Sequence, residues 1–111
     1  MAVARNKQDT RRAAGKATDK LVLATVNAPY KRAIDARTLA GCLAKAEPGV
    51  WSVHLATFFT DVSPKLVLAF ATAHGVSKSK LAEAYLVTKK RTGEKNSDLE
   101  AELVPLAAAA S

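Results

Sequence analysis

What the sequence has little of excludes several classes of protein. It contains one cysteine, Cys42, so a small scaffold held by internal disulfides is excluded. Its longest uncharged stretches, Pro48–Thr60 and Leu66–Ser77, are shorter than the roughly 18 apolar residues that a transmembrane helix needs. The basic start, Met1–Lys20, has no apolar core of the kind that a secretory signal contains. We therefore expect a cytoplasmic protein with no membrane partner.

Hydrophobic residues nevertheless make up 49 % of the 111 residues, and 23 residues are alanine. A disordered chain would contain less leucine and valine than this one. Aromatic residues reach only 5 %, which argues against modules that bind single strands by stacking bases on exposed rings. The composition is therefore that of a small, Ala-rich globular domain.

The net charge of +7 is concentrated in separate clusters. Residues 1–20 hold six basic and two acidic residues, and residues 77–95 also hold six basic and two acidic residues. Residues 46–76 contain one basic residue, and residues 96–111 contain three acidic residues and no basic one. Separate clusters of Lys and Arg are typical of proteins that contact nucleic acid, because each phosphate contact releases counterions. A solvated surface that serves only solubility is the alternative.

Apolar periodicity and turn residues predict an all-α fold, a compact bundle of about five short helices. The domain organisation has three parts, which are a flexible basic arm over 1–17, a helical domain over 18–91, and a linker with a short acidic helix over 92–111. The run Leu21–Val26 is β-branched enough to form a strand, and its short length leaves helix and strand open.

Local signals set the boundaries of the predicted helices. Ser63, which precedes a proline, is a typical helix start, and Gly75 supplies the left-handed residue that ends a helix. Ser77 can cap the next helix, and Ser97 with Glu100 has the spacing of a capping box. The predicted helices cover Tyr30–Ala46, Val50–Thr60, Lys65–His74, Lys78–Lys90 and 98–109, the last interrupted or bent at Pro105.

The segment Phe70–Ala84 resembles the helix-turn-helix of DNA-binding proteins. That motif has an apolar and then a small residue in its first helix, glycine in the turn, an apolar residue after it, and apolar anchors in its second helix. His74 departs from the pattern, because the residue before the glycine is usually apolar. Plain packing of a glycine-capped helix pair is the alternative. The residues that match the motif are Phe70, Ala71, Gly75, Val76, Leu81 and Ala84.

The resemblance implies that Lys78–Lys90 is a recognition helix. Its first turn offers hydroxyls and cations that can contact phosphates and base edges, namely Ser77, Lys78, Ser79 and Lys80. The early part of the helix has no Arg, Asn or Gln, so bidentate reading of bases is not expected. Further cations are assigned to nucleic-acid contact, namely Lys89, Lys90, Arg91, Arg11, Arg12, Lys16, Lys31 and Arg32.

The segment Gly49–Ala56 repeats the pattern Gly-Val-x4-Leu-Ala of Gly75–Ala82. Chance explains such a repeat in a chain this rich in Leu and Ala. A second helix-turn-helix-like unit is the alternative, and that unit would be structural because its second helix is apolar and uncharged.

No catalytic residue, metal site or cofactor is expected. His54 and His74 lack nearby carboxylate and thiol partners in the sequence, and Cys42 lies among leucines and alanines, where an inert buried thiol is expected. The sequence also has no phosphate-binding glycine loop and no zinc-finger spacing. We therefore predict that the protein is not an enzyme.

These observations predict a nucleic-acid-binding protein, with duplex DNA favoured over RNA. It would act as a small transcriptional regulator or a DNA-organising protein, in the nucleoid if the source is bacterial, or as a phage-encoded protein. The alternatives are a helical adaptor or assembly protein, such as a phage structural or packaging component, and an RNA- or ribosome-associated protein. A homodimer would suit paired half-sites, and Leu99, Leu103 and Leu106 can share one face of a candidate dimer helix.

Overall fold

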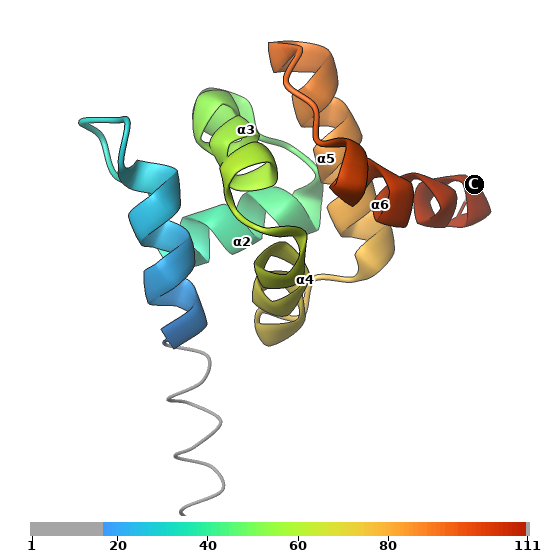
Figure 1. Ribbon diagram of the computed structural model, residues 1–111, viewed down its shortest axis with the longest axis horizontal. Helices are drawn as coiled ribbons and strands as arrows, with labels where there is room; N and C mark the ends of the chain where they lie inside the picture. The colour runs from blue at the N-terminus through green and yellow to red at the C-terminus, as the bar shows by residue number, and fades with distance from the viewer. Residues whose placement is uncertain (1–16, 111) are drawn as a thin grey trace, which may run out of the picture.

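The computed structural model describes the backbone of residues 17–110 and the side chains of residues 17–103. Across these residues the chain forms helices and connecting loops and contains no β-strand, which confirms the all-α prediction (Figure 1). The first described helix covers residues 17–27, so the run Leu21–Val26 is helical. The predicted basic arm lies outside the described residues, except for its last residue.

The helix predicted from Tyr30 begins six residues later, as α2 (Ala36–Lys45). Two side chains explain the difference. Asn27 closes the preceding loop, because its amide donates to the carbonyl of Ile34 at 3.0 Å and its Oδ1 accepts from the Ile34 N–H at 2.9 Å. Asp35 then caps α2, with Oδ1 accepting from the Thr38 N–H at 2.7 Å. Hydrogen bonds from the side chain and then the N–H of Thr38 hold the pKa of the Asp35 carboxyl below its usual value.

The middle of the chain forms a short 3₁₀ helix, η1 (Gly49–Trp51), which leads directly into α3 (Ser52–Asp61), and then α4 (Pro64–Ala73). Six successive residues of α3, His54 to Phe59, are buried, so this helix crosses the interior of the molecule. Ser63 accepts from the Leu66 N–H and Pro64 is the first residue of α4, as predicted.

The last two helices are α5 (Lys78–Thr92) and α6 (Ser97–Ala110). The capping box predicted at Ser97 is wrong. Asn96 caps α6 instead, because its Oδ1 accepts from the N–H groups of Asp98 and Leu99 at 3.1 and 3.2 Å. The helix is not interrupted at Pro105 but continues to Ala110.

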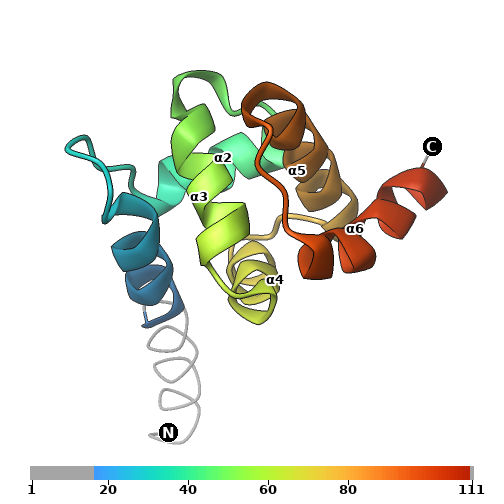
Figure 2. The same cartoon turned by 45° about the horizontal axis from the view of Figure 1, so that its top comes forward.

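Helix α5 packs against α2, α3 and α6, and the first helix and α6 lie at opposite ends of the molecule (Figures 1 and 2). Aromatic rings join the helices inside. Phe58 lies 5.5 Å from Phe70 between ring centroids, and Phe59 lies 5.4 Å from Tyr85. None of the helices described is long and apolar enough to cross a bilayer.

Part of the candidate dimer face on α6 is buried within the protein itself. Leu99 and Leu103 are fully buried and belong to the hydrophobic core. Two leucine side chains of this size contribute about 1.5–3 kcal/mol each when they are buried, so their exposure for dimerisation would be costly. The side chain of Leu106 lies outside the described residues.

Candidate nucleic-acid interface

The turn between α4 and α5 is tightly defined by backbone hydrogen bonds. Gly75 has a φ of 70°, its N–H donates to the Thr72 carbonyl at 3.2 Å, and the Val76 N–H donates to the Ala71 carbonyl at 2.8 Å. This pair of bonds is the Schellman arrangement, which requires a left-handed residue after the helix. Val76 is buried under the turn, so the direction of α5 relative to α4 is fixed by packing as well as by the turn.

His74, the residue that departs from the apolar pattern, connects this turn to the first helix. Its Nε2 lies 2.8 Å from Oδ1 of Asp19, and its ring centroid lies 4.5 Å from that of Phe70. About a quarter of each side chain of the His74–Asp19 pair is exposed. A polar side chain can therefore replace the apolar anchor here, because a partner from another helix satisfies its outer nitrogen while its ring face packs.

The first turn of α5 exposes most of the residues that were predicted there to contact nucleic acid. Ser77 caps the helix, its Oγ accepting from the Lys80 N–H at 3.2 Å. Ser77, Lys78 and Lys80 are exposed, and Ser79 is half-buried. Leu81, the next residue, is fully buried and anchors the exposed first turn to the core.

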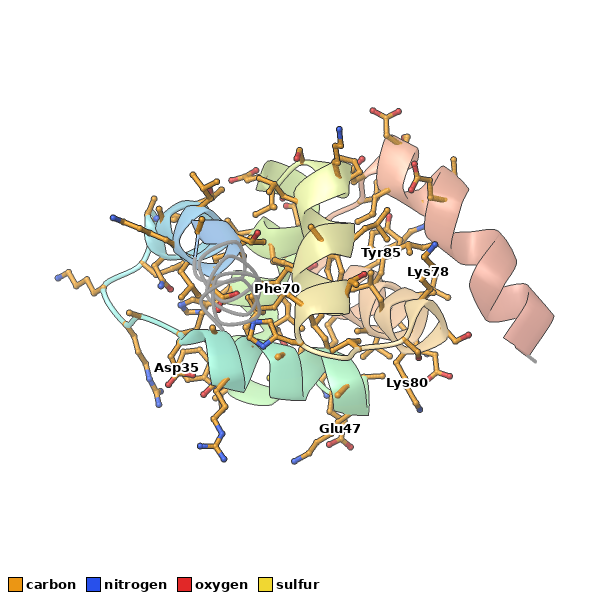
Figure 3. The ribbon with its side chains drawn as sticks, turned by 90° about the horizontal axis from the view of Figure 1, so that it is seen from below. Asp35, Glu47, Phe70, Lys78, Lys80 and Tyr85 are labelled. Carbon is orange, nitrogen blue, oxygen red and sulfur yellow. The ribbon has the colours of Figure 1, made fainter. Side chains whose placement is uncertain are left out.

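The two lysines of this turn leave α5 on different sides. Residues two apart on a helix are separated by about 200° around its axis. Lys78 lies toward α6, whereas Lys80 lies on the side of α2 (Figure 3). Lys80 Nζ is 3.1 Å from Oε2 of Glu83, and both side chains are about half exposed, at 50 % and 46 %. An exposed pair of this kind is worth little and can be exchanged for a phosphate contact.

At the other end of α5 the cations predicted to contact nucleic acid are Lys89, Lys90 and Arg91, and their surroundings differ. Lys90 is exposed. Arg91 Nη1 donates to the Gly49 carbonyl and to Ser52 Oγ, both at 3.4 Å, and so connects α5 to η1 and α3. Lys89 belongs to a half-buried polar network between α5 and α6.

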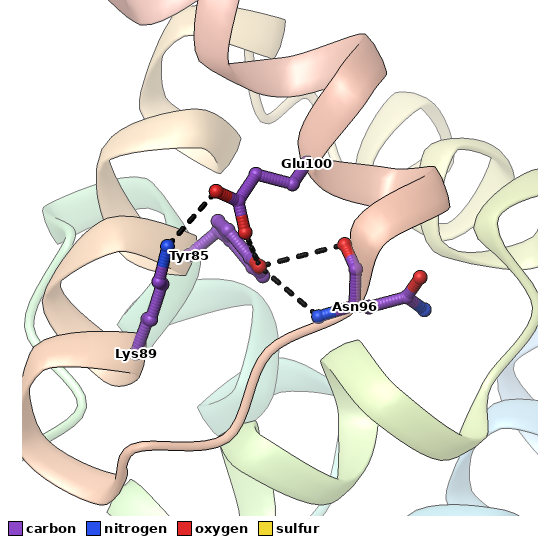
Figure 4. A network of polar contacts seen from close by, with 4 residues as sticks. All are labelled: Tyr85, Lys89, Asn96 and Glu100. Atoms are coloured by element: carbon purple, nitrogen blue, oxygen red, sulfur yellow. Dashed lines mark hydrogen bonds and ion pairs between the residues drawn. The ribbon is translucent and has the colours of Figure 1, made fainter.

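In that network Glu100 joins α6 to α5 (Figure 4). One carboxylate oxygen of Glu100 accepts from Lys89 Nζ at 2.9 Å and the other accepts from the Tyr85 hydroxyl at 2.6 Å. The Tyr85 oxygen also accepts from the Asn96 N–H at 3.1 Å. These bonds, Lys89 first, lower the pKa of Glu100, while burial and then Glu100 raise the pKa of Tyr85. Lys89 is therefore occupied by a structural contact.

The lowered pKa of Glu100 predicts a loss of stability in acid. Its folded pKa lies below the ordinary value of 4.5, so its contribution is full at neutral pH and is lost as the pH falls through the folded pKa. We expect Glu100→Gln to lower the melting temperature at pH 7, and the difference from wild type to disappear as the pH falls through the folded pKa of Glu100. Thermal unfolding across this range checks the prediction. Glu102→Gln, an exposed change on the same helix, should behave as wild type throughout, and a constant deficit for Glu100→Gln would contradict it.

The remaining selected cations lie elsewhere. Lys31 and Arg32 are exposed on the loop before α2, and Arg32 Cζ lies 4.7 Å from the centroid of the Trp51 ring. Arg11, Arg12 and Lys16 lie outside the described residues. The structure therefore does not gather all the selected residues on one surface.

Two cations that the sequence reasoning did not select, Arg37 and Lys45, lie on the outer face of α2. Both are exposed, and both line a groove of about 520 Å³ between α2 and residues 47–51. The signal in the sequence was their spacing of eight residues, which places two side chains on one helix face.

The histidines and the cysteine have ordinary structural surroundings. His54 is buried, with Nε2 2.8 Å from the Arg32 carbonyl and its ring between those of Tyr30 and Trp51. Burial raises the pKa of the Cys42 thiol, which disfavours a reactive thiolate. Among the described residues no three His, Cys, Asp or Glu side chains come together in a way that could hold a metal ion.

Comparison with known proteins adds no relative, since no family model, curated protein or solved structure matches the chain.

Proposed function

We propose that the protein binds duplex nucleic acid, with DNA favoured, through the first turn of α5. The observation that carries the proposal is the exposure of Lys78 and Lys80 at the start of a helix whose next turn is anchored in the core by Leu81. The Gly75 turn fixes the direction of this helix. A helix start supported in this way can enter a groove without a large loss of side-chain or backbone freedom.

The chemistry of this turn favours contacts with phosphate. Lysines and serine hydroxyls can pair with phosphate oxygens, and these contacts position a duplex without reading its sequence. The outer face of α5 carries Ser79, Glu83, Leu86 and Lys90, and has no Arg, Asn or Gln side chain for bidentate reading of bases. This supports a DNA-organising role over that of a sequence-specific regulator. The protein would then act in the cytoplasm, on the nucleoid if it is bacterial or phage-encoded.

A second candidate function is an adaptor or assembly role. Two exposed hydrophobic side chains support it, because Val50 of η1 is 77 % exposed and Val53 of α3 is 50 % exposed. Exposed apolar side chains of this kind occur where another protein docks. This role and binding of structured RNA are the rivals that the following experiment separates.

Affinity for duplex DNA is expected to fall steeply with salt. Each phosphate contact contributes about −0.9 to the slope of log K against log salt, so several contacts lower affinity at least tenfold between about 0.05 and 0.2 M salt. Mobility-shift titrations with duplex DNA, single-stranded DNA and structured RNA at these concentrations check the prediction. Preference for RNA would support the ribosome-associated alternative, and no binding even at low salt would remove nucleic acid as the partner.

A further inference from the structure

The groove on the outer face of α2 is a candidate binding site to which α5 contributes no lining residue. Arg37, Gly41 and Lys45 line it from α2, one helical turn apart from each other, and Glu47 and Val50 line its opposite wall. Arg37 and Lys45 are separated by eight residues, or roughly 12 Å along the helix, which equals the rise of about 3.5 base pairs. Two cations at this spacing can reach phosphates of one strand.

Gly41 lies between these two cations and has no structural reason to be glycine. It is in the interior of α2 and does not have a positive φ. A Cβ atom built there would meet nothing within 4 Å. Glycine weakens a helix relative to alanine, so its presence here opposes the stability of α2. What glycine does provide at the floor of the groove is room for another backbone to approach closely.

The cations of the groove are available for a ligand. Neither Arg37 nor Lys45 forms an ion pair with any residue that the structure describes, in contrast to Lys80 and Lys89. Glu47 is the carboxylate in the groove. Asp35 lies near Arg37, whose charge adds to the Thr38 hydrogen bonds in lowering the pKa of the Asp35 carboxyl. The balance along the groove itself is two positive charges against one negative charge.

The groove and the start of α5 face the same side of the molecule. Viewed along the axis of Figure 3, Lys80 and Glu47 both project from the edge that α2 and the start of α5 form together. Lys78 lies away from this edge, toward α6. A duplex that contacts Lys80 from this side would therefore also pass over α2.

We propose that the α2 groove binds the sugar-phosphate backbone of a DNA duplex, with Arg37 and Lys45 contacting phosphates of one strand on either side of Gly41. The groove thereby extends the interface that begins at Lys80. This inference rests on the proposed function and adds a second contact surface to it.

The test compares matched variants in binding to a short mixed-sequence DNA duplex. Arg37→Gln with Lys45→Gln should reduce the salt slope by about 1.8, the loss of two phosphate contacts. Lys65→Gln with Lys95→Gln removes the same charge from exposed positions outside the groove and should leave the slope almost unchanged. Circular dichroism and melting temperature of each variant establish that folding is intact.

Two single changes test the geometry and the sign of the charge effect. Gly41→Gln fills the floor of the groove and should weaken binding at least fivefold while the melting temperature does not fall, because the added side chain enters open space. Ala44→Gln, exposed on the same helix outside the groove, is its control. Glu47→Gln should strengthen binding more than Glu102→Gln does.

The outcomes separate this inference from the proposed function. Absence of duplex binding by the wild-type protein overturns both. Duplex binding that the groove variants change no more than their controls overturns the contact at the α2 groove and leaves the proposed function standing. Losses confined to the groove variants, with Lys78 and Lys80 dispensable, overturn the interface at α5 and with it the proposal that the groove extends that interface.

Discussion

Gly75→Val is expected to lower the free energy of unfolding by about 2–3 kcal/mol, because a β-branched side chain would be held at a φ of 70°. The space around Gly75 is open, with nothing within 4 Å of an added Cβ, so a clash does not explain the loss. The cost comes from the backbone conformation alone. In a domain of this size it corresponds to a fall in melting temperature of at least about 8 °C.

Asparagine at the same position is the matched control. Asn tolerates the left-handed region better than other residues with a Cβ, so Gly75→Asn should cost about 1 kcal/mol or less. Thermal and denaturant unfolding of the two variants measure the difference. Equal stability of Gly75→Val and wild type would mean that the Schellman turn does not hold α5 in place, and the basis for a fixed recognition helix would be lost.

The sequence predicted the elements whose signals are local. Ser63 and Ser77 were identified as caps because a hydroxyl three residues before a helical N–H is sufficient to satisfy it, and both accept the expected bonds. Gly75 and Val76 were placed correctly for the same reason, since the turn depends on adjacent residues. Leu81 was predicted to be an apolar anchor of the second helix and is fully buried.

The elements that were missed depend on contacts between distant residues. Ala33, Ala36 and Ala40 have helical spacing, but Asn27 and Ile34 close the region from Tyr30 to Asp35 into a loop. Glu100 had the spacing of a capping residue, but it bonds Tyr85 and Lys89 across the α5–α6 contact instead. Pairings of this kind follow from how helices pack, which periodicity in one segment does not specify.

The repeat of Gly-Val-x4-Leu-Ala shows the same limit. Gly49 and Gly75 both have positive φ, and Leu55 and Leu81 are both fully buried. The valines differ, since Val76 is buried while Val50 is 77 % exposed. Equal patterns therefore give similar helix starts but different surfaces, since Val76 packs under its turn whereas Val50 lines the α2 groove.

Replacing Lys78 and Lys80 together with alanine is expected to reduce affinity for duplex DNA roughly 30-fold near 0.1 M salt, the effect of losing two phosphate contacts. Stability should change by less than about 0.5 kcal/mol, because both side chains are exposed and the Lys80–Glu83 pair is solvated. The control is Lys65→Ala with Lys95→Ala, which removes the same charge from other exposed sites. Fluorescence titrations with a labelled duplex measure both.

The single variants Lys78→Ala and Lys80→Ala show how α5 contacts the duplex. Lys78 and Lys80 lie on different sides of α5, so a helix that inserts its end into a groove uses both lysines equally (Figure 3). A duplex that lies over α2 but not over the end of α5 would use Lys80 and spare Lys78, and the double change would then cost only about one phosphate contact. If the double change has no effect while loss of Arg11, Arg12 and Lys16 abolishes binding, the first turn of α5 does not contact DNA. The basic arm would then be the contact, and the helices would serve as an adaptor that the arm attaches to nucleic acid.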